Sequence, residues 1–265
     1  MKTLSILMVG CFLFLCSTSS NAFVGEDNFD DNSIDLSKWS FFSSSGTSEL
    51  RESSSVLQFR DPVGSSDGMN LLAWAQALPD DESWTAMIDV SIPFGLLDTS
   101  LDQEFYLTMG VANANDFTDS VSIDYTHSVF NNSEVASFGI YKQVDDSDVV
   151  AFHSPTSVSS ASLMIQWSDL DSKFKIGYLA GGNAVILQEI SVSDWNLRPD
   201  DPFMLGIGLG TEGNGLTFGW DDGVFEDNFK VSSTSSSVPE PTAVSLFLLG
   251  IGFFVRNLRK KNGCV

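Results

Sequence analysis

A period-two alternation of apolar and polar residues runs through the middle of the chain. In WTAMIDVSI (residues 84–92) and FYLTMGV (residues 105–111), every second residue belongs to one apolar series. Five further runs show the same alternation, at residues 121–125, 163–167, 174–178, 185–187 and 203–209. Successive side chains of a strand point to opposite faces, so this pattern predicts strands with one buried face. Helical spacing of apolar residues is hard to find in the same region.

Polar turn sequences separate these runs. They are RDPVGSSDG, NANDFTDS, VDDSD, AGGN, RPDDP and TEGNG, all rich in the residues that favour turns. About twelve short strands with such spacing predict an all-β, antiparallel sandwich. We find no internal repeat with a solenoid or propeller period, which argues against a propeller.

The N-terminal segment has the anatomy of a secretory signal peptide. Lys2 precedes an apolar stretch at residues 4–16, and Ser20 and Ala22 occupy the positions of a small-residue cleavage site. We therefore expect residues 1–22 to be a signal peptide that is cleaved after Ala22. A lipoprotein signal ending at Cys11 or Cys16 is the less favoured alternative.

The cysteines and charges are divided unevenly along the chain. The three cysteines, Cys11, Cys16 and Cys264, lie in the terminal segments, so the region between them must be stable without disulfides. The terminal segments also hold five of the 13 basic residues, which leaves eight against all 35 acidic ones and a net charge of −27. Such a charge excludes nucleic acid and anionic lipid as partners of this region and supplies many potential cation ligands.

The C-terminal segment combines a short apolar stretch with a basic end. A serine-rich linker at residues 232–237 leads to a hydrophobic helix predicted at about residues 242–258. Its thirteen residues at 243–255, apolar apart from Ser245, extend only about 20 Å as a helix, short of a ~30 Å hydrocarbon core. A basic cluster follows and is expected to stay on the cytoplasmic side: Arg256, Arg259, Lys260 and Lys261.

This C-terminal arrangement resembles the PEP-CTERM sorting signal of Gram-negative bacteria. The motif is Val238, Pro239, Glu240 and Pro241, followed by the helix and the basic end, over residues 238–265. The resemblance implies an exosortase as processing partner and transient anchoring in the inner membrane. Export to the cell surface or the extracellular matrix of an exopolysaccharide-producing bacterium would follow.

The region between the signals resembles the concanavalin A-like lectin and glucanase jelly roll. DDNSIDLSKWSFF opens it, SKFKIGYLAGGNAVILQEISV predicts a late hairpin, and GVFEDNFKV closes it. We assign this domain to residues 23–231, with Trp39 in its core. The resemblance implies that the first and last strands lie side by side.

The glucanases of this fold carry a catalytic E-x-D-x-x-E motif on one strand, which this sequence lacks. In the nearest candidate, MIDVSI, the three positions are Met87, Asp89 and Ile92. We therefore predict a domain that is not an enzyme, while a rearranged acid pair from separate strands stays an alternative. His127 and His153 have no partners at zinc-ligand spacing and are read as ordinary strand or loop residues.

Two further functional features remain in the domain. The glycines of GIGLGTEGNG (residues 206–215) open no helix, so we interpret them as a sheet hairpin and not as a phosphate-binding loop. The jelly-roll resemblance also implies a structural calcium ion where the first and last strands meet. Its predicted carboxylate ligands are Asp227, Asp27, Glu26 and Asp30.

Aromatic residues supply the candidate binding surface. Most of the six Trp, four Tyr and 21 Phe residues must fill the core of a sandwich. Trp74, Tyr106 and Tyr125 are the predicted exceptions that could stack on sugars; Tyr106 falls on the side of its strand opposite Phe105 and Leu107. The leading hypothesis is a non-catalytic domain that binds polysaccharide. The alternatives are a structural or adhesive surface protein and a divergent glycoside hydrolase.

Overall fold

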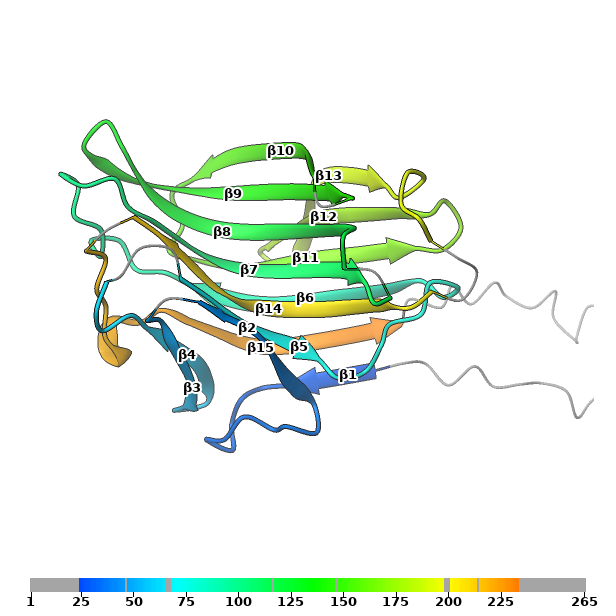
Figure 1. The fold of residues 1–265 in the computed structure, drawn as a ribbon, viewed down its shortest axis with the longest axis horizontal. Coiled ribbons are helices and arrows are strands. Elements are labelled where there is room, and N and C mark those ends of the chain that lie inside the picture. Colours follow the sequence, from blue (N-terminus) through cyan, green and yellow to red (C-terminus); the bar gives the residue numbers. More distant parts are fainter. Residues whose placement is uncertain are drawn as a thin grey trace, which may run out of the picture. The chain divides into compact units, whose positions relative to one another are not determined.

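The computed structural model describes residues 24–233, except residues 46, 65–67, 116, 146, 198–200 and 214. The described residues form fifteen strands and one short 3-10 helix (Figure 1). These are β1 (Val24–Asp27), β2 (Trp39–Ser45), β3 (Glu49–Ser53), β4 (Val56–Arg60), β5 (Gly68–Trp74), β6 (Trp84–Ser91), β7 (Glu104–Asn113), β8 (Ser120–Phe130), β9 (Ser133–Val144), β10 (Ser147–Thr156), β11 (Ser160–Ser168), β12 (Lys173–Ala180), β13 (Asn183–Ser191), β14 (Phe203–Glu212), η1 (Trp220–Asp222) and β15 (Phe225–Ser233).

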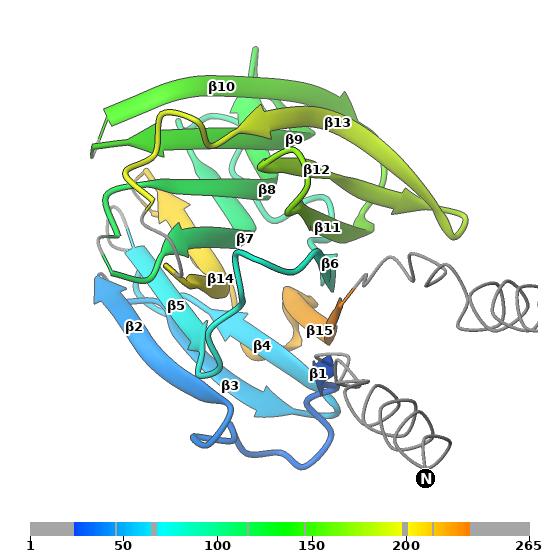
Figure 2. The same ribbon diagram turned by 90° about the vertical axis from the view of Figure 1, so that its right-hand side faces the viewer.

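The strands are arranged in two antiparallel sheets, which Figure 2 shows as two layers. Within the described residues, the seven-stranded sheet has the order β10-β9-β8-β7-β14-β5-β2. The eight-stranded sheet has the order β13-β12-β11-β6-β15-β4-β3, and β1 pairs with β15. The prediction of an all-β, antiparallel sandwich is confirmed.

The core lies between the two sheets and follows the alternation in the sequence. Leu107, Ile123 and Ile207 face inward from the seven-stranded sheet, and Ile88 and Ile165 from the other; all five are fully buried. Removing these side chains from water is the main source of the sandwich's stability. Their polar neighbours on the same strands consequently lie on the outer faces.

An aromatic cluster ties the beginning of the domain to its end. The predicted core residue Trp39 is 1% exposed, and its ring lies 4.8 Å from the Phe229 ring of β15 and 4.9 Å from the Trp74 ring. Its indole N–H donates a 2.7 Å hydrogen bond to Asp27 Oδ2 on β1. β1 and β15 pair from Val24 with Ser232 to Asp27 with Phe229, so the first and last strands lie side by side as predicted.

The two hairpin predictions have different outcomes. β12 and β13 pair as the predicted late hairpin, joined by Gly181 and Gly182. The glycine-rich stretch, however, is not a hairpin, because β14 lies between β5 and β7 and pairs with both of them. Gly206, Gly208 and Gly210 are therefore part of a central strand of the seven-stranded sheet, and Gly213 and Gly215 follow it.

β15 contains a bulge that places a carboxylic acid in the core. The register shifts between Asp227 and Lys230, and Asn228 has a φ of 51°. Because the bulge changes the phase of the alternation, both Glu226 and Phe229 face inward. Glu226 is 0% exposed, and neither of its carboxyl oxygens has a hydrogen-bond partner among the described residues.

Among residues 24–233, as far as they are described, no helix has the length and apolar character needed to cross a membrane. The predicted signal peptide (residues 1–22) and sorting signal (residues 238–265) lie outside the described residues.

Candidate functional site

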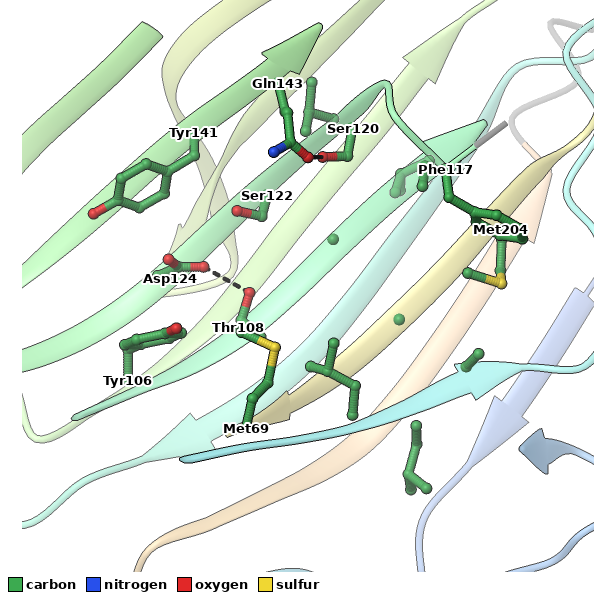
Figure 3. A pocket seen from close by; sticks show the side chains of 18 of the residues that line it. Met69, Tyr106, Thr108, Phe117, Ser120, Ser122, Asp124, Tyr141, Gln143 and Met204 are labelled. Atoms are coloured by element: carbon green, nitrogen blue, oxygen red, sulfur yellow. Dashed lines mark hydrogen bonds between the residues drawn. The ribbon is translucent and has the colours of Figure 1, made fainter. Parts of the chain in front are cut away.

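A groove of about 530 Å³ lies on the outer face of the seven-stranded sheet. Its floor is formed by β7, β8 and β14, and residues of β5 and β9 also line it. On β7 the groove residues run from Glu104 to Ala112, which corresponds to roughly 27 Å of extended strand. Figure 3 shows the polar and aromatic side chains that rise from this face. The groove is long enough to hold an oligomeric ligand.

Glycines leave the floor of the groove bare and allow two tyrosine rings to lie on it. Gly206, Gly208 and Gly210 alternate along β14 with the buried core residues Leu205, Ile207 and Leu209. A Cβ atom at Gly210 would overlap the ring of Tyr106, and one at Gly139 would lie 2.9 Å from Cε2 of Tyr141. The two rings are therefore seated over glycine backbone, where any other residue would displace them.

A buried carboxyl group lies in the middle of the floor. Asp124 on β8 is 7% exposed and accepts a 2.6 Å hydrogen bond from Thr108 Oγ1, its direct neighbour on β7 (Figure 3). Burial raises the pKa of Asp124 to about 7, and the Thr108 and Ser122 hydroxyls oppose this shift. Near neutral pH the group thus exists in both its protonated and its ionised form.

The two ends of the groove differ in chemistry. At its acidic end, Glu104 of β7 lies directly opposite Glu212 of β14. Burial raises the pKa of Glu104, and the charges of Glu212 and Asp102 raise it further. At its apolar end the groove is lined by Phe117 and Met204.

The structure separates the three predicted stacking residues. Tyr106 lies in the groove, with its ring over the floor. Tyr125 is fully buried and Trp74 is 6% exposed, so the prediction that they present rings to a sugar is wrong. Tyr125 shares the inward phase of Ile123, and its hydroxyl group bonds to the Val158 carbonyl; Trp74 packs on Trp39 and Phe229.

The predicted calcium ligands do not form one cluster. Asp27 is buried and accepts hydrogen bonds from the Trp39 side chain and the Phe29 N–H, whereas Glu26 and Asp30 are exposed. Asp227 bonds to Asn228, which also contacts Asp89. Among the described residues no group of three or more His, Cys, Asp or Glu side chains is arranged to hold a metal ion. Calcium binding at the β1–β15 junction stays a prediction.

The strand compared with the catalytic motif lies on the opposite side of the sandwich. β6, which carries Met87 and Asp89, belongs to the eight-stranded sheet, whereas the groove lies on the seven-stranded sheet. The absence of the E-x-D-x-x-E motif from β6 therefore says nothing about which reactions the residues of the groove could catalyse.

The fully buried His127 lies on the inward face of β8. Its Nδ1 is 2.6 Å from Glu134 Oε1 and its Nε2 is 3.0 Å from the Tyr125 hydroxyl oxygen. Burial lowers the pKa of His127, which Glu134 opposes. Because Glu134 also accepts a hydrogen bond from Gly95 N–H, this network fastens the loop before β7 to the sheet.

Sequence reasoning missed most of the residues that line the groove. Glu104, Asp124, Tyr141 and Glu212 were not singled out. The signal that could have found them is the outward phase of β14: Gly206, Gly208 and Gly210 fall on one face and leave it empty.

The sequence matches no protein-family profile and no curated protein. Among solved structures, a putative beta-glucanase from Mycobacterium abscessus has a TM-score of 0.53 and 13% identity, covering 80% of this chain and 99% of that chain. The catalytic domain of a laminarinase from Thermotoga petrophila RKU-1 has a TM-score of 0.48 and 10% identity, covering 80% and 97%. Lectin UEA-II complexed with galactose has a TM-score of 0.49 and 11% identity, covering 80% and 98%.

The likeness to the putative beta-glucanase shows that the domain has the fold of that protein. It contradicts the prediction that the domain is not an enzyme, because a fold that it shares with a putative beta-glucanase gives no ground for excluding an activity. At 10–13% identity the likeness is one of fold. The activity of this chain must be argued from its own groove.

Proposed function

We propose that the domain binds a glycan chain in the groove of the seven-stranded sheet. The observation that carries this proposal is the pair of tyrosine rings, Tyr106 and Tyr141, seated on glycine backbone in the groove floor. An aromatic ring offers a flat apolar face to the C–H groups of a sugar, and its hydroxyl group can bond to the sugar hydroxyls. Because glycine has no side chain, the rings lie directly against the strand backbone, and the space above them is left for the ligand.

The polar groups around the rings fit the same ligand. Asp124, Ser122 and Gln143 supply carboxyl, hydroxyl and amide groups along the floor (Figure 3). Sugar-binding sites combine apolar surface with a few such directional groups. The roughly 27 Å over which the groove follows β7 favours an oligosaccharide over a single sugar.

Hydrolysis is a second candidate function, favoured by Asp124. With a pKa of about 7, this carboxyl could donate a proton to a glycosidic oxygen. Glu104 is the nearest second acid on β7, but it is four residues from Thr108, the neighbour of Asp124, which is on the order of 13 Å along the strand. This spacing exceeds both the about 6.5–9.5 Å of an inverting carboxyl pair and the about 5 Å of a retaining pair, so hydrolysis has less support than binding.

One experiment distinguishes three outcomes: glycan binding, glycan hydrolysis and neither activity in the groove. The purified protein is titrated by calorimetry with laminari-, cello- and chito-oligosaccharides, and reducing ends are measured in the same samples. We expect saturable binding that Tyr106→Ala weakens at least about fivefold, because stacking of a ligand ring on one aromatic side chain contributes about 1–3 kcal/mol. Phe130→Ala, which removes an exposed aromatic outside the groove, is the matched control.

New reducing ends that are lost in Asp124→Asn would establish hydrolysis, and binding without them would establish a glycan-binding domain. Absence of saturable binding to every oligosaccharide, or equal loss of affinity in Phe130→Ala, would refute the proposal.

We also propose that the chain is exported and sorted by an exosortase to the cell surface or matrix. The support is the ordered combination of Val238–Pro241, apolar stretch and basic end in the sequence. A surface or matrix location would bring the groove into contact with exopolysaccharide, its proposed ligand. A structural surface protein without a glycan ligand would have the same location. The groove favours the glycan-binding function over this alternative.

A further inference from the structure

We infer that the glycan bound in the groove is cationic: a polymer that contains amino sugars with free ammonium groups, held at the acidic end by Glu104 and Glu212. This inference rests on the proposed function and specifies its ligand. It follows from the charges that line the groove, the lack of partners for the two glutamates, and their position next to Tyr106.

The groove has charges of one sign. Its described lining contains three carboxyl side chains, Glu104, Asp124 and Glu212, and no Lys, Arg or His. A glycan carrying uronate or sulfate groups would bring further negative charge to these carboxylates and would be repelled. A cationic group is attracted, most strongly where two carboxylates face each other.

Glu104 and Glu212 form such a pair. They are directly opposite each other on β7 and β14, and like charges in this position destabilise a sheet. Neither side chain has a hydrogen bond or an ion pair within the described part of the chain. Burial and the neighbouring acids Glu212 and Asp102 raise the pKa of Glu104, as expected of carboxylates without a counter-ion. An ammonium group between them would relieve this repulsion.

Four of the domain's cations are engaged elsewhere. Lys38 pairs with Asp27, Arg60 with Glu49, and Lys142 with Asp194. Arg51 and Arg60 also lie over the ring of Trp220, at 4.2 and 4.6 Å from its centroid. Among the described residues no ion pair brings a positive charge to the acidic end, which leaves this role to the ligand.

The acidic end lies one step from the aromatic ring. Glu104 and Tyr106 project from the same face of β7, about 6.6 Å apart along the strand. A sugar stacked on Tyr106 therefore has substituents within reach of Glu104 and Glu212.

The test compares three hexasaccharides of matched length: glucosamine, N-acetylglucosamine and glucose oligomers. The purified protein is titrated with each at pH 6, in the presence of a chelator so that no metal ion bridges carboxylates. We expect the glucosamine oligomer to bind most tightly. Glu104→Gln and Glu212→Gln should each weaken its binding by up to about fivefold, because one ion pair contributes up to about 1 kcal/mol. Binding of the glucose oligomer should change less than twofold.

The domain is strongly acidic, so non-specific attraction of a cation needs a control. Glu189→Gln removes one negative charge from an exposed position on β13, in the other sheet. It should leave the affinity for the glucosamine oligomer unchanged. Equal weakening by Glu189→Gln and Glu212→Gln would refute the inference, because the attraction would then arise from net charge.

The inference and the proposed function fail in different ways. If the neutral oligomers bind as tightly as the glucosamine oligomer and only Tyr106→Ala weakens them, the groove binds glycans but the cationic specificity is wrong. If none of the three binds, both the inference and the proposed function are wrong.

Discussion

Glu226 makes the stability of this protein depend on pH in a way that one substitution can isolate. Its side chain is fully buried, opposite Leu57 on one neighbouring strand and Val90 on the other. Burial raises the pKa of Glu226 well above its ordinary value of 4.5. The Gly208 N–H approaches the carboxyl and opposes this shift, but too loosely to complete a hydrogen bond. We therefore expect the folded protein to keep Glu226 protonated where the unfolded chain ionises it.

The sign of the effect follows from proton binding. Above pH 4.5 the folded state holds one more proton at this site than the unfolded state does, so the free energy of unfolding falls as pH rises. The loss is about 1.4 kcal/mol per pH unit for one proton, and it continues until the folded carboxyl itself ionises. Glu226→Gln removes this site and keeps the shape of the side chain. We expect the variant to match the wild type near pH 4 and to become increasingly more stable than the wild type as the pH rises, by up to about 1.4 kcal/mol per pH unit.

Urea unfolding, followed by tryptophan fluorescence between pH 4 and pH 8, measures this difference. The contributions of the other acidic residues cancel because they are present in both proteins. Glu189→Gln, at an exposed position on β13, is the control and should give a nearly flat difference. Glu226→Leu should raise the free energy of unfolding by a further about 1–3 kcal/mol at every pH, since it also removes the unsatisfied oxygens. A pH-independent difference between Glu226→Gln and wild type would refute the argument, because the carboxyl would then be solvated or ionised in the fold.

Two further predictions concern the groove and the sorting signal. Gly210→Ala should displace the Tyr106 ring and reduce glycan affinity at least about fivefold, because the added Cβ overlaps the ring. Calorimetry measures this, and an unchanged affinity would show that the position of the ring over Gly210 is not needed for binding. Replacing Val238–Pro241 with alanines should leave the C-terminal tail uncleaved and the protein in the inner membrane. Cell fractionation and mass spectrometry of the protein's C-terminus measure this, and normal surface delivery would contradict the predicted signal.

The sequence predicted the sandwich because alternation specifies which face of each strand is buried. Residues 203–209 and 163–167 are examples, and both became strands with the expected inner residues. A bulge changes this phase without a hydrophobic signal. In β15, simple alternation would place Phe225, Asp227 and Phe229 on one face, whereas the bulge at Asn228 places Glu226 inside with Phe229. The burial of Glu226 could therefore not be read from the sequence.

Which strands meet decides the groove, and the sequence does not state this. Glu104 and Glu212 are more than a hundred residues apart, yet β7 and β14 pair and place them directly opposite each other. The alternation did place Tyr106 on the outer face and Tyr125 with the inner residues of β8. Tyr125 and Trp74 share the phase of the buried residues Ile123 and Leu72, so the alternation of their strands indicates buried rings.

The two kinds of acid in this sandwich respond to different partners. Gly208 lies in β14, a strand of the groove floor, and its N–H acts on the buried carboxyl of Glu226. Glu104 and Glu212 face the groove, so a cationic ligand can relieve their repulsion. Glu226 is out of reach of any ligand, and only a proton can neutralise it. A protonated Glu226 adds no charge beneath the floor, so Glu226→Gln should alter stability with pH and leave glycan affinity unchanged.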